Sequence, residues 1–202
     1  MKQIGIMGGS FDPPHIGHLL LAEWIQKELK LEEIRFIPTG RIYHKEPQKV
    51  SAKDRLEMVR LAVLGYPAFT VDATEVEREG ITYTYETVEE LKQREPENQL
   101  TFLVGADSLD YMERWKYPER IFSACRIAAV IRPGFSYEQM EEKIRQLKAQ
   151  FDADILLVPT PEIPISSTDL RKKLNGGESV KEWIPKPVEE YIKKHGLYQQ
   201  KP

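Results

Sequence analysis

Six short apolar runs constrain the fold of this chain more than any other feature of its sequence. Each run has the length of a β-strand, and most are followed by glycine, proline or aspartate. Because the runs are apolar throughout, they predict strands that are buried on both faces of a sheet. The six predicted strands are residues 3–7, 34–38, 69–73, 100–105, 126–131 and 155–159.

The amphipathic stretches between these runs predict helices. Apolar residues recur every four positions from Leu21 to Leu29 and indicate a helix over 18–29. Ser51 and Asp54 have the spacing of a capping box at the start of the next helix. Further helices are expected over 84–94, 137–150, 167–174 and about 187–195, with stops at Asn175-Gly176 and at Gly196.

Strands that alternate with helices along a chain form parallel sheets with helices on both faces. The alternation here predicts an α/β fold with a Rossmann-like doubly wound parallel sheet. A length of 202 residues fits one domain, and no internal repeat divides the chain. We expect a single domain over 1–202, in which residues of about 165–198 form a small helical C-terminal portion.

The composition limits the kinds of partner that the protein can bind and the cellular compartment in which it can lie. The net charge is −3, and basic residues are interspersed with acidic ones, so the sequence has no electrostatic footprint for nucleic acid. No apolar run is long enough for a membrane span or a signal peptide. Cys125 is the single cysteine and has no partner for an internal disulfide. We expect a cytoplasmic protein that binds neither nucleic acid nor membranes.

The first predicted strand leads into a helix through GGSFDPPHIGH, residues 8–18. Doubly wound sheets bind ligands outside the carboxyl ends of their strands, commonly at this first turn. Gly8 and Gly9 would let the backbone approach a ligand closely and would tolerate positive φ angles. The start of the helix would offer unpaired N–H groups and the positive end of its dipole, which suit an anion.

Two histidines, His15 and His18, are three residues apart at this turn and would project from nearly the same side of it. Gly17, between them, would leave room for a bulky ligand beside the helix. The arrangement fits a pair of imidazole donors aimed at phosphate oxygens. Such donors would stabilise the charge that develops during phosphoryl or nucleotidyl transfer.

Three other interpretations of the two histidines are open at this point. A zinc site needs a third and a fourth ligand, but the other histidines are His44 and His195, and no HExxH pattern exists. A histidine could activate Ser10 as a nucleophile, but GGSF is not the G-x-S-x-G elbow. The pair could also be two ordinary histidines of the core.

The stretch GGSFDPPHIGH resembles the His-x-Gly-His signature of the nucleotidyltransferase superfamily. In this long form it is similar to the bacterial nicotinate-nucleotide adenylyltransferases. The resemblance implies a reaction of ATP with nicotinate mononucleotide that gives the deamido dinucleotide and pyrophosphate. It also implies Mg²⁺, which would bridge phosphate oxygens of ATP and needs few protein ligands.

A second stretch, ISSTDLR at 165–171, lies at the start of a predicted helix and resembles the element with which this family holds the β- and γ-phosphates of ATP. Ser166 or Ser167 can cap the helix, which leaves hydroxyl and amide groups for a triphosphate. Arg171, one turn later, would place a guanidinium on the same phosphates. The alternative is an ordinary capped helix with a surface arginine.

Segment 72–87, DATEVEREGITYTYET, resembles the family's acidic, Arg-Gly and Ser-Tyr-Thr region, with Thr82 where serine is usual. In the family this region lies against the nicotinate ring and its carboxylate. The resemblance therefore implies acceptor contacts from Thr84, with its backbone, and from Tyr85. A helix cap at Thr82 or Thr84 is the alternative, and the two roles can coexist.

Segment 104–122 begins with Gly105-Ala-Asp at the end of a predicted strand. A carboxylate at the carboxyl end of a strand can accept hydrogen bonds from ribose hydroxyls, which suits Asp107. Trp115 has the spacing of a tryptophan in the family, which implies that it stacks on the pyridine ring. An ordinary packing role for Trp115 is the alternative.

Two basic residues complete the resemblance. His44-Lys45 is similar to a basic pair that the family uses near the reacting phosphates, although Ile42 and Tyr43 stand where the family has two prolines. Lys45 could also be a solvated lysine. Arg132 matches a family position close to the nucleotide, with a plain surface arginine as the alternative.

Taken together, the resemblance implies three overlapping groups of residues and no protein metal ligand. The catalytic group would be His15, His18 and Arg171. The ATP contacts would be Gly8, Gly9, Ser10, Phe11, His15, His18, Gly105, Asp107, Ile165, Ser166, Ser167 and Arg171. The contacts to nicotinate mononucleotide would be Ser10, Lys45, Thr84, Tyr85, Trp115 and Arg132.

Several functional assignments stay open on the sequence. The acceptor could be amidated nicotinamide mononucleotide or phosphopantetheine, although pantetheine enzymes would not call for the Thr84 and Trp115 segments. A non-catalytic nucleotide-binding regulator could keep the fold, but it would be expected to lose a motif histidine or Arg171. An interaction domain would leave both phosphate motifs unexplained. The sequence does not decide between a monomer and a homo-oligomer.

Overall fold

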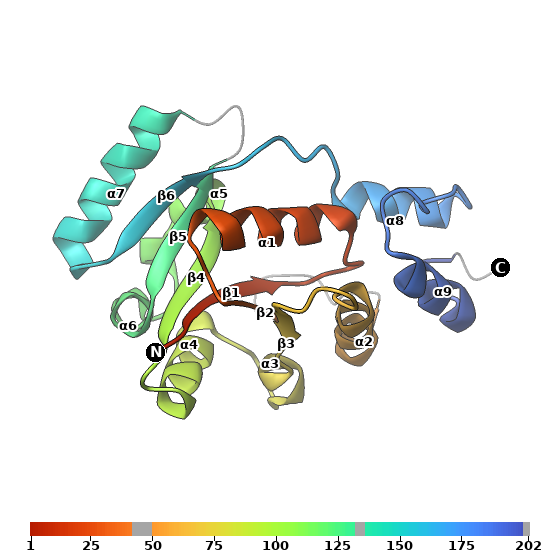
Figure 1. Ribbon diagram of the computed structural model, residues 1–202, viewed down its shortest axis with the longest axis horizontal. Helices are drawn as coiled ribbons and strands as arrows, with labels where there is room; N and C mark the ends of the chain where they lie inside the picture. The colour runs from red at the N-terminus through yellow and green to blue at the C-terminus, as the bar shows by residue number, and fades with distance from the viewer. Residues whose placement is uncertain (42–49, 132–135, 200–202) are drawn as a thin grey trace.

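The computed structural model describes residues 1–41, 50–131 and 136–199, and its centre is a parallel β-sheet (Figure 1). The six strands have the order β3-β2-β1-β4-β5-β6, and each pairs in parallel with its neighbours. This confirms the predicted fold class and all six predicted strands. The strands are β1 (Gln3–Gly9), β2 (Glu33–Pro38), β3 (Phe69–Val71), β4 (Gln99–Gly105), β5 (Arg126–Ile131) and β6 (Ile155–Pro159).

The six predicted helices are also present, and where the prediction gave bounds, the ends differ from it by at most two residues. They are α1 (Ile16–Glu28), α2 (Ala52–Ala62), α4 (Thr84–Arg94), α7 (Tyr137–Phe151), α8 (Ser167–Asn175) and α9 (Lys186–His195). The sequence analysis predicted α2 from its capping residue Ser51 and gave no bounds for it. The prediction missed four short helical segments, which carry too few turns to show a periodic pattern. They are α3 (Thr74–Glu77), α5 (Ala106–Leu109), η1 (Met112–Arg114) and α6 (Pro118–Ala124).

The structure changes one expectation about a helix start and extends another about a helix face. Ser51 caps α2 by accepting from the Asp54 N–H at 3.1 Å, but the Asp54 carboxylate accepts from the Ser51 hydroxyl, so the capping box is only half formed. In α1 the predicted apolar residues do face the core, since Ile25 is buried and Leu21 and Leu29 pack against the same cluster, but Gly17, Leu19 and Ala22 are buried there as well.

Helices cover both faces of the sheet, and Figure 1 shows α1 and α4 on opposite sides of it. Side chains alternate along each strand, so that Ile4 and Ile6 of β1 belong to one apolar cluster and Met7 to the other. The first cluster is covered by α4, α6 and α7, and the second by α1 and α2. Burial on both faces explains why most residues of the strands are apolar.

The order of the strands reverses between β1 and β4, because the chain builds the sheet outward from β1 in one direction and then from β4 in the other. Ligands of open α/β sheets bind in the crevice outside the carboxyl ends of the strands at such a switch point. The loop after β1 and the turn after β4 both lie at this edge. The fold therefore brings the sequence around residues 8–18 next to that around 105–107.

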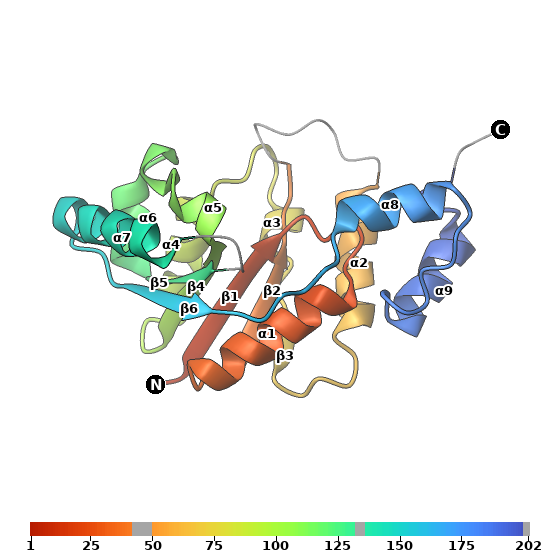
Figure 2. The same cartoon turned by 90° about the horizontal axis from the view of Figure 1, so that it is seen from above.

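The C-terminal helices pack against the same core as the sheet. Leu170 of α8 and Val188 of α9 belong to the cluster that contains Met7 and Phe11. Tyr191 of α9 donates a hydrogen bond to Asp54 of α2 at 2.9 Å, and Figure 2 shows α8 and α9 beside α2, beyond the end of the sheet. No helix in the described part of the chain is long and apolar enough to cross a membrane.

Arg35 of β2 joins two acidic residues near the amino ends of the strands. Its side chain is 11% exposed and donates to Glu33 at 2.9 Å and to Glu95 at 2.7 Å. Burial opposes the charge of Arg35, but the bonds to Glu95 and Glu33 outweigh it and raise the pKa of the guanidinium. Arg35 in turn lowers the pKa of Glu95.

We predict that Arg35→Met destabilises the protein by about 3 kcal/mol at pH 7, because two carboxylates lose their partner. Since the folded pKa of Glu95 is depressed, its stabilisation is present above the unfolded pKa of about 4.3 and is lost as pH falls through the folded value. Urea titrations at pH 7 and pH 3 should therefore show a steeper loss of stability for the wild type than for the variant. Arg145→Met, at an exposed ion pair with Glu142, is the control and should change little.

Candidate active site

The loop between β1 and α1 differs from its prediction in where the backbone turns. The left-handed residue is Phe11, with φ of 47°, and neither Gly8 nor Gly9 uses the positive φ that a glycine tolerates. Both glycines belong to β1. A Cβ on Gly9 would come within 3.1 Å of the Phe11 ring, so Gly9 makes room for Phe11 beside the strand end. The peptide bond between Asp12 and Pro13 is cis.

The two histidines form the start of α1. His15 is the N-cap residue, and its backbone N–H donates to Nδ1 of His18 at 3.2 Å. The imidazole rings stack with their centroids 3.7 Å apart, and the Phe11 ring meets His18 edge-on at 5.0 Å. Because Nδ1 of His18 accepts a hydrogen bond, the neutral ring carries its proton on Nε2, which is a donor.

A cleft of about 190 Å³ opens beside the histidine pair. Both predicted phosphate motifs contribute to its wall, which confirms that the fold brings them together. The cleft is lined by His15, Gly17, His18, Leu21, Thr160, Pro161, Ile163, Ile165, Ser166 and Ser167. Within residues 1–41, 50–131 and 136–199, no three His, Cys, Asp or Glu side chains are grouped so that they could hold a metal ion.

The start of α1 offers fewer unpaired N–H groups than the sequence predicts. The Ile16 N–H donates to the Trp183 carbonyl at 2.9 Å, and the His18 N–H donates to the His15 carbonyl at 2.9 Å. Trp183 lies in the segment between α8 and α9, so the C-terminal portion of the chain satisfies part of this helix end. Side-chain donors therefore gain importance for any anion that binds here.

Gly17 lines the cleft and also makes room for a neighbouring segment of the chain. A Cβ on Gly17 would lie 2.7 Å from Cγ2 of Ile165 and 2.9 Å from Cγ2 of Ile163. Both distances are shorter than folded proteins tolerate, so a side chain at this position would overlap the 163–165 segment. Gly17 thus lets the second motif pack directly against the first.

The second motif makes the predicted cap and two further contacts. Ser166 is the N-cap of α8 and accepts from the Asp169 N–H at 3.2 Å, which leaves Ser167 as the first helical residue. The Ser167 hydroxyl donates to the Pro13 carbonyl at 3.0 Å. The Arg171 guanidinium donates to the Asp12 carbonyl at 2.7 Å. Both contacts attach α8 to the loop that precedes the histidines.

Arg55 is a site residue that the sequence analysis missed. Its side chain is 1% exposed and donates to the carbonyls of Ser10 at 2.7 Å and Thr39 at 2.6 Å. Burial lowers the pKa of the guanidinium, and the charge of Asp12 opposes that shift. A signal was present, because Arg55 lies on the same face of its helix as the apolar residues Met58 and Val59.

At the carboxyl end of β4, Asp107 lies where the sequence predicts it. It is an exposed residue in the first turn of α5, and a Cβ on Gly105 would come within 2.3 Å of its carboxylate. Gly105 therefore allows the carboxylate to fold back over the end of the strand. The ends of β1 and β4 are neighbours at the switch point of the sheet, as the fold class predicts, but Gly105 and Asp107 do not line the cleft beside the histidines.

The segments predicted to hold the acceptor are only partly available for binding. Thr84 is the first residue of α4 and is half-buried, and Tyr83 occupies the N-cap position that the sequence analysis assigned to Thr82 or Thr84. Tyr85 is 7% exposed and donates to Glu86 at 2.8 Å, so its ring belongs to the core. Trp115 is half-buried and meets the Phe102 ring at 6.4 Å.

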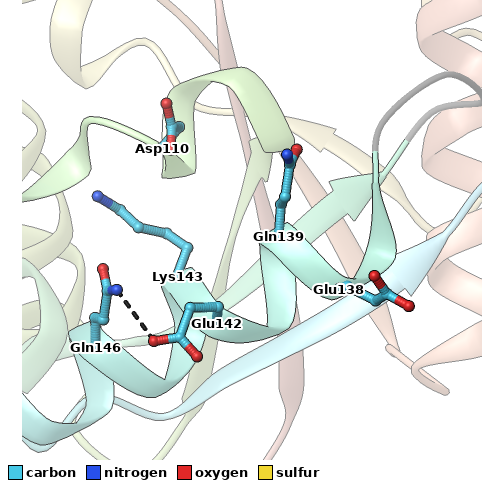
Figure 3. Close-up of a pocket in the computed structure, with 6 residues that line it drawn as sticks. All are labelled: Asp110, Glu138, Gln139, Glu142, Lys143 and Gln146. Atoms are coloured by element: carbon cyan, nitrogen blue, oxygen red, sulfur yellow. Dashed lines mark hydrogen bonds between the residues drawn. The ribbon is translucent and has the colours of Figure 1, made fainter.

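Lys45 and Arg132 lie outside the described residues. A second cleft, of about 380 Å³, lies between the end of α5 and the exposed face of α7 (Figure 3). It contains no residue of the predicted site. Its wall consists of Asp110, Glu138, Gln139, Glu142, Lys143 and Gln146.

We predict that Gly17→Ala destabilises the protein by about 1–3 kcal/mol, because the added methyl group overlaps Ile163 and Ile165. Thermal unfolding of the variant measures this loss. Gly176→Ala is the control, since a Cβ there meets its nearest atoms at an ordinary 3.5 Å and the backbone has φ of −82°. A Gly17→Ala protein as stable as the control would contradict the packing described here.

The comparisons with known proteins agree with this geometry. A family model for cytidylyltransferase-like proteins matches residues 6–173. A protein of Dehalococcoides mccartyi named "probable nicotinate-nucleotide adenylyltransferase" is 42% identical over 196 residues, with 96% of both chains covered. A protein of the same name from a Thermoanaerobacter species is 39% identical and covers 97% of this chain and 94% of its own length.

Solved structures show the same fold. Nicotinic acid mononucleotide adenylyltransferase from Plasmodium falciparum, in a complex with NaAD, superposes with a TM-score of 0.79 at 22% identity and with 98% of each chain covered. The same enzyme in a complex with APC superposes with a TM-score of 0.76. The family match over most of the chain and the identity to full-length relatives lead to one conclusion. The chain belongs to the cytidylyltransferase-like family and, within it, to the nicotinate-nucleotide adenylyltransferases.

Proposed function

We propose that this protein transfers the adenylyl group of ATP to nicotinate mononucleotide and releases pyrophosphate. The observation that carries the proposal is the meeting of two motifs far apart in the sequence at one cleft. His15 and His18 come from the first motif, and Ser166 and Ser167 from the second. Family membership supports the same activity, since the relatives carry that enzyme's name.

ATP would lie in the cleft with its triphosphate between the starts of α1 and α8. The positive dipole end of each helix favours an anion there. Arg171 uses two of its N–H donors on Asp12 and Thr168, and a guanidinium has five. It can therefore keep the loop in place and still face the β- and γ-phosphates. Gly105 and Asp107 would receive the ribose at the neighbouring strand end.

The transfer needs positioning more than proton transfer. The phosphate oxygen of the acceptor attacks the α-phosphorus of ATP in line, and the bond to the bridging oxygen of the β-phosphate breaks, so that pyrophosphate leaves with the electron pair. A phosphate monoester has a second pKa of about 6 and is already an anion near neutral pH. A general base is therefore not required, and rate enhancement rests on alignment and charge stabilisation.

His18 would supply the main stabilisation at the α-phosphate. Its Nδ1 is occupied by the His15 N–H at 3.2 Å, which orients the ring and leaves Nε2–H as the donor. The edge-on contact with Phe11 fixes the same orientation. A donor held in place before the reaction stabilises developing charge without a cost of reorganisation. His15, stacked on it, would hold the neighbouring phosphate oxygens.

The substrate would be the Mg²⁺ complex of ATP. Mg²⁺ is commonly held by phosphates and water with one or two carboxylates, so an all-protein cage is not needed. The ion would neutralise charge on the triphosphate and assist the departure of pyrophosphate.

The acceptor would lie on the side of the sheet that carries α4. Thr84 and the backbone at the start of α4 would bind the nicotinate carboxylate, and the half-buried Trp115 would stack on the pyridine ring. Tyr85 would act by packing, since its side chain is in the core. Ser10, Lys45 and Arg132 would also contact the acceptor, with Lys45 near the reacting phosphates, as the family resemblance implies.

The first experiment measures pyrophosphate release from the purified protein with ATP and Mg²⁺. Nicotinate mononucleotide, its amide and phosphopantetheine are supplied in separate reactions. We expect a clear preference for the acid, because one polar contact to the carboxylate discriminates it from the amide. Preference for another acceptor would remove the roles of Thr84 and Trp115, and release from none with ATP still bound would indicate a nucleotide-binding regulator.

We predict that His18→Ala lowers kcat by about 10²- to 10³-fold, the effect of removing one donor that stabilises transition-state charge. Binding of ATP, measured by calorimetry, should change little. His195→Ala is the control, because His195 is an exposed residue in the last turn of α9 and stacks on Tyr191. A His18→Ala protein with near-normal kcat would refute this mechanism.

A further inference from the structure

Tyr198, three residues beyond the end of α9, reaches the loop that carries the catalytic histidines. Its hydroxyl donates to Oδ1 of Asp12 at 2.6 Å, across 186 residues of sequence. Asp12 is 6% exposed and directly precedes the two prolines before His15. Burial, followed by the charge of Asp12, raises the pKa of Tyr198, so the hydroxyl keeps its proton and remains a donor.

The end of α9 determines the direction of this contact. Gly196 has φ of 60° and ends the helix in the left-handed conformation. The Leu197 N–H then donates to the Ile192 carbonyl at 3.0 Å, which is the closing bond of a Schellman motif. Tyr198 follows with φ of 62°, also left-handed. The left-handed conformations of Gly196 and Tyr198 bend the chain back toward the loop, where Tyr198 packs against the core.

The Asp12 carboxylate lies in a small cluster of charges below the loop. The charge of Asp12 acts on Arg55, and both Arg55 and Arg171 act on Tyr198. The backbone carbonyl of Asp12 accepts from Arg171, while its side chain accepts from Tyr198. Asp12 is therefore held at two atoms by two elements of the C-terminal portion.

We propose that Tyr198 is a positioning residue for the adenylyl transfer, because it fixes Asp12 and thereby the loop that places His15 and His18. The inference rests on the proposed function. The hydroxyl does not touch the reacting atoms, and its effect is exerted through the backbone between Asp12 and His15. A shift of about 1 Å in a catalytic group costs as much as 10²-fold in rate, so a single remote hydrogen bond can matter.

The test compares Tyr198→Phe with Tyr191→Phe. Each variant removes one hydroxyl that donates to an aspartate from the C-terminal portion, but Tyr191 donates to Asp54 of α2 and not to the loop. We expect Tyr198→Phe to lower kcat by about ten- to a hundredfold, with KM for ATP changed less than about threefold. Tyr191→Phe should keep kcat within about twofold of the wild type.

Histidine side-chain NMR provides a readout that does not depend on turnover. The chain has four histidines. Tyr198→Phe should shift the imidazole signals of His15 and His18, whereas Tyr191→Phe should shift those of His195, whose ring stacks on Tyr191 at 4.1 Å. Comparable melting temperatures of the two variants would separate positioning from a general loss of stability.

The possible results lead to distinct conclusions. An unchanged kcat in Tyr198→Phe, or unchanged signals of His15 and His18, would overturn the positioning role. Loss of kcat in both variants to the same extent would overturn it as well, because the effect would then be structural. A wild type that turns over no acceptor would refute the proposed function, while the NMR comparison would still decide whether Tyr198 places the histidines.

Discussion

Side-chain hydrogen bonds to the carbonyl groups of residues 10–13 are the constraint on which the rest of the site depends. The loop between β1 and α1 leaves the regular ladder of the sheet, so each of its buried carbonyls needs another donor. Arg55 supplies one to Ser10, Arg171 to Asp12 and Ser167 to Pro13. The loop that ends at the N-cap histidine is thus held from two helices, α2 and α8.

These bonds limit what the second motif can offer to a phosphate. The Ser167 hydroxyl has one proton, and it donates that proton in the hydrogen bond to the Pro13 carbonyl. In this arrangement the hydroxyl can only accept a hydrogen bond from any other group. Donation to a phosphate from this position would come from the backbone N–H at the start of α8. Arg171 has no such restriction. Its planar guanidinium binds the Asp12 carbonyl with one N–H group and has further N–H groups that can donate to a phosphate.

The sequence predicts the sheet well and the loops poorly, and the reason is physical. An apolar strand or an amphipathic helix is specified by neighbours within a few positions, so β1 to β6 and the longer helices could be predicted. The left-handed turn falls on Phe11 although two glycines are near, because Phe11 gains a buried place against His18 and Phe36. Such tertiary contacts override the local preference for glycine in the left-handed conformation.

Prediction from sequence reaches the same limit at the candidate active site. Its two motifs were predictable, because each has a local pattern and the resemblance joins them. The donors that shape the loop lie 45, 154 and 159 residues from their acceptors, and no local pattern encodes a pairing over such separations. Gly17 illustrates the consequence: the residue type correctly indicated a close approach, but the approaching group is Ile165 of the second motif. The histidines and the phosphate-binding helix are therefore parts of one packed unit, and a change in either motif alters the geometry of both.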